Sequence, residues 1–495
     1  MPARSLEPSS ISRDVSAQVL AQLLAHVLIG VSVVLLVRHF SPHDNGLLNV
    51  AWGLTGFATF LTDLGLNISL VRSASSASPE RRRALIWTSF RLRASLVFGV
   101  VSLGLIASFV WPMDPELRTL LRVLVLPMTV VTMLLNWVDN VMVACERIAL
   151  SARFTFIWNL AHIGATILTP LMNGSLVTYA LWHIALTSSV SVLGLVWVWR
   201  NFTYSSRHDR GVLEGLPALG GGEFLTNIVD YIPSFTLVPP LMGFASHGAF
   251  GAGEKIPRSL FFLPFGLGKA FFTRMCQAWP ENADPDRLEL HDSLVLNSIR
   301  VGAIIGGVFG IGLFVTAPEL IQFLWPDKWP PETAVTLAII GFVPFVKTIG
   351  FPLLNAFASS RQYPLRARAL GVYAISAVIA FLTLPRLYGV TGAALAALAS
   401  ELALLVTTLF LKRAALRSRV IGLGSRFVLP VMAGVGLALL VKPWWQLNIH
   451  PLFDACLPAA FGALTFILGV IALDAQTRGV LQQVWQQRTK PELEP

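Results

Sequence analysis

Three of the basic residues within or beside one strongly apolar stretch, residues 256–275, can share one face of a helix. In a helix with about 100° per residue, Arg258 and Lys269 differ by only about 20° around the axis, and Lys255 lies within about 60° of Arg258. A cation that faces lipid at the membrane centre costs about 2.5–3.5 kcal/mol on insertion scales. The spacing therefore predicts a stripe of cations that lines a water-filled cavity and binds an anion.

A second interpretation of this stripe stays open. Lys255 and Arg258 would then lie at the outer membrane interface and extend their charged ends into water, which leaves only Lys269 buried. Pro257 and Pro264 also kink the helix and change the angles between the side chains.

The preceding apolar stretch, residues 221–243, supplies the opposite charge. Glu223, Asn227 and Asp230 occur at i, i+4 and i+7, which places them on one face of a helix. These carboxylates are either structural partners of the cations or protonatable groups that couple transport to an ion gradient, because burial raises a carboxylate pKa towards neutrality. For Glu223, a cap at the helix N-terminus is a third alternative.

Two further charges lie inside apolar runs. Asp63 occurs in the stretch FLTDLGLNISLVR, where Arg72 is nine residues further on, about 180° around the helix, so the two cannot pair directly. We expect Asp63 to make a polar contact between lobes or to line a cavity, and both alternatives stay open. Lys347, between Pro344 and Pro352 in FVPFVKTIGFP, is a fourth candidate for a cavity cation.

Other polar residues inside apolar runs are predicted to serve helix packing. Asp139 and Glu401 are expected to form hydrogen bonds between helices. Three histidines are expected to be packed polar residues rather than proton sites: His26, His162 and His183.

Composition identifies the kind of element that must position these charges. Of 495 residues, 54% are hydrophobic and only 13% are charged, well below the quarter that is usual in soluble domains. The three cysteines are far apart and form no disulfide or metal pattern. The net charge of +10 comes from basic residues spread over short loops, which argues against a nucleic-acid partner. The chain is therefore predicted to be an all-α polytopic membrane protein.

Hydropathy and charge together predict about fourteen membrane-spanning helices. They are placed at residues 14–37, 46–71, 94–111, 119–144, 151–172, 175–199, 221–243, 256–275, 295–317, 335–358, 367–385, 390–411, 422–441 and 454–473. Lys and Arg concentrate in alternate loops, so the rule that positive loops face the cytoplasm puts both termini inside. The expected location is a bacterial cytoplasmic (inner) membrane.

An internal repeat divides the predicted helices. The run GLLNVAWGLTGFATFLTDLGLNISLVR from Gly46 resembles GAFGAGEKIPRSLFFLPFGLGKAFFTR from Gly248, and residues 173–200 resemble residues 388–413. Each match joins a helix to the sixth one after it, as in parallel repeats that place a substrate site between two halves. The sequence thus predicts a six-helix lobe with its linker at 1–214, a second six-helix lobe at 215–413, and two appended helices with a tail at 414–495.

Several of these stretches resemble the polysaccharide transport (oligosaccharide flippase) family of the multidrug/oligosaccharidyl-lipid/polysaccharide exporter superfamily. They are TDLGLNISLVR, CERIALSARFTFIWNL, NIVDYIPSF followed by GAFGAGEKIPR, and YGVTGAALAALASELALL. The resemblance implies two lobes around a central cavity and an undecaprenyl-diphosphate-linked oligosaccharide, moved from the cytoplasmic to the outer leaflet by alternating access. It also implies a glycosyltransferase and a polymerase as partners. Glu254 and Lys255 depart from the tyrosine and small residues usual in the family.

Three function classes are weighed against one another. A flippase for an anionic, lipid-linked oligosaccharide needs no cofactor beyond a possible H⁺ or Na⁺ gradient, and its expected partners are that substrate and membrane lipid. A multidrug exporter of the same superfamily is the alternative, although cationic drugs favour acidic cavities. A membrane polysaccharide polymerase or ligase is disfavoured, because the predicted outer loops are short and the chain lacks a nucleotide-binding glycine loop and a metal-ligand cluster. We expect no enzyme activity.

Overall fold

The computed structural model describes residues 34–75, 77–145, 147–209, 238–260, 285–325, 329–360, 362–444 and 451–478, with a few isolated positions between them. Within these ranges the chain forms helices and turns and no strands. Nine helical segments of the described part are long and apolar enough to cross a membrane. The predicted all-α polytopic fold class is confirmed.

Two compact units make up the chain, residues 1–251 and 252–495. The first contains α2 (Pro42–Asp63), α3 (Leu66–Ser75), α4 (Pro79–Val110), α5 (Pro115–Leu120), the π-helical turn η1 (Leu121–Val125), α6 (Leu126–Ala144), α7 (Ile148–Leu171) and α8 (Leu176–Asn201). The boundary falls within α10 (Val238–Ser259). The lobe division at residue 214 was placed on the repeat rather than on contacts, and it stays a prediction.

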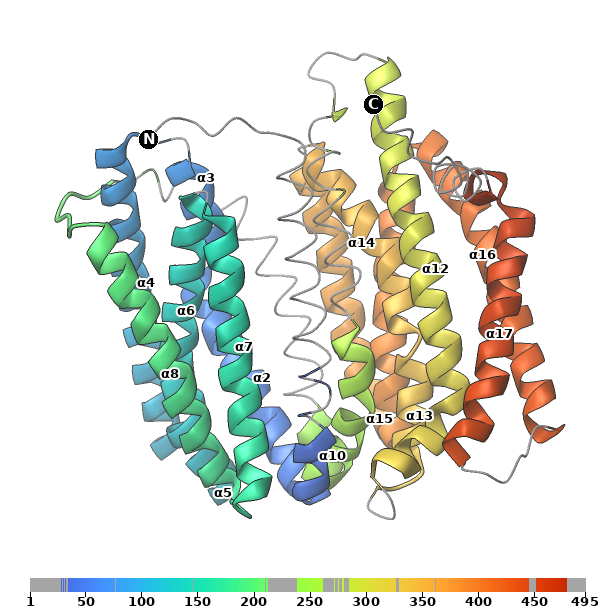
Figure 1. Cartoon of the computed structure of the whole chain (residues 1–495), viewed down its shortest axis with the longest axis horizontal. Coiled ribbons are helices and arrows are strands. Elements are labelled where there is room, and N and C mark those ends of the chain that lie inside the picture. Colours follow the sequence, from blue (N-terminus) through green and yellow to red (C-terminus); the bar gives the residue numbers. More distant parts are fainter. Residues whose placement is uncertain are drawn as a thin grey trace, which may run out of the picture. The chain divides into compact units, whose positions relative to one another are not determined.

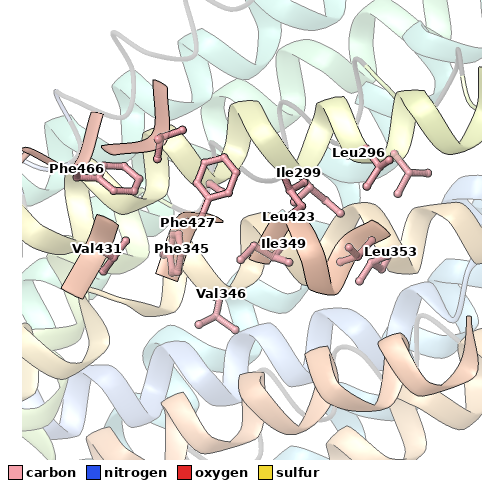
Figure 2. Packing of buried hydrophobic residues seen from close by; sticks show 14 of the residues in the cluster. Leu296, Ile299, Phe345, Val346, Ile349, Leu353, Leu423, Phe427, Val431 and Phe466 are labelled. Atoms are coloured by element: carbon pink, nitrogen blue, oxygen red, sulfur yellow. The ribbon is translucent and has the colours of Figure 1, made fainter. Parts of the chain in front are cut away.

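The second unit continues with α12 (Pro285–Leu324), α13 (Glu332–Ile340), α14 (Val343–Ser359), α15 (Tyr363–Leu411), α16 (Ala414–Val441), the short 3₁₀ turn η4 (Lys442–Trp444) and α17 (Pro451–Leu473). Helices α12, α16 and α17 run side by side (Figure 1). Their core, which α14 completes, contains Leu296, Ile299, Phe345, Ile349, Leu353, Leu423, Phe427, Val431 and Phe466 (Figure 2). This buried core does not explain which residues lie on the outer surface of the bundle.

Large apolar side chains also cover the outward faces of the helices. On α4, Phe98, Leu103 and Phe109 are exposed, and on α16 Leu429 and Met432 are exposed. Contiguous exposed apolar surface on this scale is unusual in a soluble monomer and suits contact with lipid. These exposed apolar residues add to the hydropathy of each helix, which is why hydropathy alone located the helices in the sequence.

Loops predicted to share a side of the membrane meet in the first unit. His39 Nε2 lies 2.7 Å from the carbonyl oxygen of Gly174, and both belong to predicted outer loops. At the other end, Arg81 Nε donates to Asp209 Oδ2 at 3.0 Å, joining two predicted cytoplasmic loops. This pairing agrees with the predicted alternation of the loops, and which end faces the cytoplasm stays a prediction.

Several predicted helix boundaries were wrong. The single helix expected at 46–71 is broken, because Leu64 and Gly65 have positive φ values of 43° and 85°. The helix expected from residue 94 begins at Pro79, and the one expected from residue 256 is already helical after a break at Gly243 (φ 80°). Hydropathy detects only the apolar part of a helix, so it misses polar first turns and backbone breaks.

Asp474 joins three helices of the second unit just after α17 ends. Its buried carboxylate accepts hydrogen bonds from Arg300 Nε at 3.0 Å, Arg426 Nη1 at 3.1 Å and Thr477 Oγ1 at 2.6 Å. Burial by itself would raise the pKa of Asp474, but the hydrogen bonds from Thr477 and the charge of Arg300 outweigh it and lower the pKa. The folded state therefore favours the ionised carboxylate.

A carboxylate with a lowered folded-state pKa stabilises the protein above its unfolded pKa of about 4, and this contribution is lost as the pH falls through the folded pKa. We expect Asp474→Asn to lower the free energy of unfolding at pH 7 by about 1.5–3 kcal/mol. The variant should also lose part of the acid sensitivity below about pH 4. Thermal unfolding of both proteins at pH 7 and at acid pH measures this, and equal acid sensitivity would contradict it.

Candidate functional site

A cavity of about 420 Å³ opens within the first unit. Its walls come from α2, α3, α6 and α7, and the residues that line it are Trp52, Thr55, Gly56, Thr59, Phe60, Asp63, Asn67, Met128, Thr132, Asn136, Trp158 and His162. Ligand pockets for small molecules fall in the range of about 300–1,000 Å³ and combine aromatic walls with a few polar groups. This cavity has both features.

The break between α2 and α3 positions Asp63 on the cavity wall. Leu64 caps α2 in the left-handed conformation, and Gly65, where a positive φ is inexpensive, lets the chain restart as α3. Asp63 Oδ1 accepts a hydrogen bond of 3.0 Å from the backbone N–H of Asn67, in the first turn of α3. A carboxylate at a helix N-terminus is stabilised by unpaired N–H groups and by the helix dipole.

Arg93 of α4 neutralises this carboxylate. Its Nη2 atom donates to Asp63 Oδ1 at 2.7 Å and to Asn67 Oδ1 at 2.5 Å. The Arg93 side chain is 1% exposed, whereas that of Asp63 is 28% exposed. The pair therefore carries no net charge, and its exposed part is the carboxylate of Asp63.

Aromatic rings and two histidines form another part of the cavity region. His162 Nδ1 lies 3.0 Å from His183 Nε2, so one proton is shared between the two rings. Trp52 packs against both, with ring centroids 5.6 Å from His162 and 4.8 Å from His183. Both histidines are packed polar residues, as the sequence predicted, while His26 lies outside the described residues.

The described part of the cation stripe lies on α10. Arg258 Nη1 is 3.5 Å from Glu254 Oε1, one turn earlier, and Lys255 is partly buried beside them. The ring of Phe244, near the start of this helix, contacts the ring of His43 in a predicted outer loop. Arg258 is fourteen residues further on, about 21 Å along the helix, and its depth in the membrane stays a prediction.

The remaining predicted site residues divide into two groups. Lys347 of α14 forms an ion pair of 2.7 Å with Glu401 of α15, and the hydroxyl of Tyr373 donates to the same carboxylate at 2.6 Å. These contacts favour a structural role for Lys347. Its role as a cavity cation stays a prediction. Lys269, Glu223 and Asp230 lie outside the described residues, so their roles stay predictions.

Comparisons with known proteins agree with these features. Residues 11–252 match the family model described as polysaccharide biosynthesis protein. A solved structure of the lipid II flippase MurJ, in an inward closed conformation, is similar to this chain with a TM-score of 0.71 and 13% identity, covering 92% of this chain and 98% of that one. The family match supports the predicted resemblance over residues 11–252, and the structural match extends the similarity of fold to most of the chain.

An inward-facing multidrug resistance transporter of the MATE family, in the MOP superfamily, is also similar, with a TM-score of 0.64 and 12% identity over 82% of this chain and 99% of that one. A search of curated protein sequences gave no match. At these identities the structural similarity establishes the fold. This fold is shared with a lipid II flippase and with a multidrug resistance transporter.

Sequence reasoning missed Arg93. The residue directly precedes the helix expected at 94–111, so it was counted with the loop although α4 already begins at Pro79. The available signal was the spacing of Arg91 and Arg93 in SFRLRASLVF. Arg91 contacts loop 202–209, with Nη2 donating to the Arg207 carbonyl at 3.0 Å, while Arg93 points to Asp63.

Proposed function

We propose that this multi-pass membrane protein is a flippase for an undecaprenyl-diphosphate-linked oligosaccharide used in surface polysaccharide (O-antigen, capsule or exopolysaccharide) biosynthesis. The observation that carries the proposal is the presence of two cations, Lys255 and Arg258, on the apolar helix α10. Buried cations in a membrane protein face a cavity or an opposite charge. A diphosphate supplies that charge during transport.

In the proposed mechanism, alternating access carries the head group across the cytoplasmic membrane while the lipid tail stays in the bilayer. Lys255, Arg258, Lys269 and Lys347 would neutralise the diphosphate, and no covalent bond forms or breaks. An H⁺ or Na⁺ gradient would supply the energy through Asp63, Glu223 or Asp230. A glycosyltransferase that supplies the substrate and a polymerase that consumes it would be the pathway partners.

One observation favours a multidrug exporter instead. Asp63 lines a cavity in the first unit, and a carboxylate there would attract a cationic drug. However, Arg93 lies 2.7 Å from this carboxylate and cancels its charge. We therefore rank the exporter second.

The leaflet distribution of lipid-linked oligosaccharide tests the two functions. A deletion strain should accumulate this lipid in the cytoplasmic leaflet, and the wild-type gene should restore its transfer. Arg258→Ala should slow the transfer about tenfold or more, since a hydrogen bond to a charged group contributes about 1.5–3 kcal/mol. Arg386→Ala, which changes an exposed arginine on α15, is the matched control.

One result would reject this function, and a second would reject only its mechanism. An unchanged leaflet distribution in the deletion strain, together with altered tolerance of cationic drugs, would move the protein to the exporter class. Normal transfer by Arg258→Ala would keep the flippase but remove the α10 cations from its mechanism.

A further inference from the structure

Another cavity of the first unit, of about 480 Å³, lies at the start of α4 and shares no lining residue with the cavity described above. The residues that line it are Ser78, Glu80, Arg81, Ala84, Arg207, His208 and Asp209. Loop 202–209 is held against α4, because Arg91 Nη2 donates to the Arg207 carbonyl at 3.0 Å and Thr88 Oγ1 accepts from the Asp209 N–H at 3.2 Å. The loop and the first turns of α4 therefore form the walls of this loop cavity.

Hydrogen-bond donors of the loop cavity are accessible to a ligand. Arg81, which is 55% exposed, pairs with Asp209 through Nε at 3.0 Å, and within the described ranges its two terminal nitrogens have no acceptor. His208 Nδ1 lies 3.4 Å from Arg91 Nη2, and since an arginine only donates, Nδ1 accepts and Nε2 carries the proton of the neutral ring. Arg207 is exposed and adds a second guanidinium. The cavity thus offers donors to an acceptor.

Positive charge exceeds negative charge around the loop cavity. Both oxygens of Asp209 already accept hydrogen bonds, Oδ2 from the ion pair and Oδ1 from the N–H of Gly211 at 2.9 Å. Glu80 is the other carboxylate of the lining, whereas Arg83 and Arg91 also contact the loop and add cations. Planar guanidinium groups match the geometry of a phosphate, whose oxygens accept several hydrogen bonds. The ligand class that fits is therefore a phosphate.

Aromatic side chains beside the same loop favour a phosphate that belongs to a lipid. Tyr204 and Trp199 are 58% and 63% exposed, and their rings lie 5.3 Å and 6.2 Å from that of Trp87. Arg91 Nη1 is 3.3 Å from the Tyr204 hydroxyl, which joins these rings to the cavity. Exposed Trp and Tyr are typical of membrane surfaces, and basic pockets between helices at that level bind acidic lipid head groups.

We propose that the loop cavity binds the phosphate of an acidic membrane phospholipid. Arg81, Arg207 and the Nε2–H of His208 donate to the phosphate oxygens, and the acyl chains lie beside Tyr204 and Trp199. Glu80 opposes this binding. The bound lipid holds loop 202–209 against α4 and is distinct from a transported molecule, so the proposal does not depend on the proposed function.

Native mass spectrometry of the full-length protein in detergent tests this proposal. The probes are phosphatidylglycerol as the acidic lipid, phosphatidylcholine as a lipid without net charge, and inorganic phosphate as a competitor. We expect phosphatidylglycerol to bind at least fivefold more tightly than phosphatidylcholine. Arg81→Gln and Arg207→Gln should each weaken the tightest phosphatidylglycerol binding about fivefold, the contribution of one arginine near an acidic lipid. Glu80→Gln should strengthen it, because a repelling charge is removed.

Arg386→Gln, at an exposed position of α15, is the matched control and should bind as the wild type does. Arg81→Gln also removes the ion pair with Asp209, so Arg207→Gln, whose unfolding temperature should equal that of the wild type, is the decisive variant. Equal affinity for the two lipids, or equal phosphatidylglycerol affinity in the wild type and Arg207→Gln, would overturn the proposal. Inorganic phosphate that competes at the same concentration as the lipid would overturn it too, by assigning the cavity to a free anion.

Discussion

Asp63→Ala should destabilise the protein more than the loss of Asp63 and Arg93 together. The single substitution leaves the Arg93 guanidinium buried beside a neutral side chain, because Arg93 is 1% exposed. Breaking a buried ion pair by removing one partner costs about 3–5 kcal/mol, whereas replacing both partners with apolar groups is often neutral. The double variant Asp63→Ala/Arg93→Met should therefore recover most of the lost stability.

The two single variants should also differ from each other. Asp63 is 28% exposed to the cavity, so water can hydrate its carboxylate when Arg93→Met removes the cation. We expect this variant to be milder than Asp63→Ala. Thermal unfolding of the four proteins in detergent forms a double-mutant cycle, which isolates the pair energy. Two results would contradict an ion pair in which the arginine is the buried partner. One is that the stability losses of the single variants are additive in the double variant, and the other is that Arg93→Met loses more stability than Asp63→Ala.

Gly248→Ala should separate α2 from α10 and lower the unfolding temperature. A Cβ atom on Gly248 would overlap the backbone carbonyl oxygen of Pro42, and one on Gly46 would overlap that of Phe244. A backbone carbonyl cannot rotate away as a side chain does, so the helices must move apart. Overpacking of this kind costs about 1–3 kcal/mol, and Gly248→Leu should cost at least as much.

Gly99→Ala on α4 is the matched control, because a Cβ at that position has no other atom within 4 Å. Alanine has the higher helix propensity, by about 0.8–1.0 kcal/mol, so this control should be neutral or stabilising. Equal unfolding temperatures for the two alanine variants would show that the helices can separate without loss. In that case the close crossing does not stabilise the first unit.

The internal repeat shows how much of the tertiary structure a sequence pattern can predict. Gly46 and Gly248 were matched because each begins an equivalent apolar run, and in the structure α2 and α10 contact each other at these two positions. In the first copy α2 is interrupted after Asp63, and the counterpart position in the second copy is Pro264, outside the described residues.

The candidate site was predictable only in part. Asp63 was identified as an ionisable residue inside an apolar run, which is an unfavourable position unless a partner or a cavity exists. Its partner was not identifiable, since Arg93 is thirty residues away on another helix and its role depends on how α4 is rotated. For Lys347 the pattern indicated a cavity, while the structure pairs it with Glu401, which also accepts a hydrogen bond from Tyr373.

The sequence by itself determined that this protein is an all-α membrane protein with alternating loops, because hydropathy, helix length and loop charge are local properties that lipid and water select directly. Only the tertiary structure decided where α2 breaks and which charges pair. Those outcomes depend on the rotation and contact of helices far apart in sequence. The cavity around Asp63, Thr59 and Trp158 is assembled by that packing.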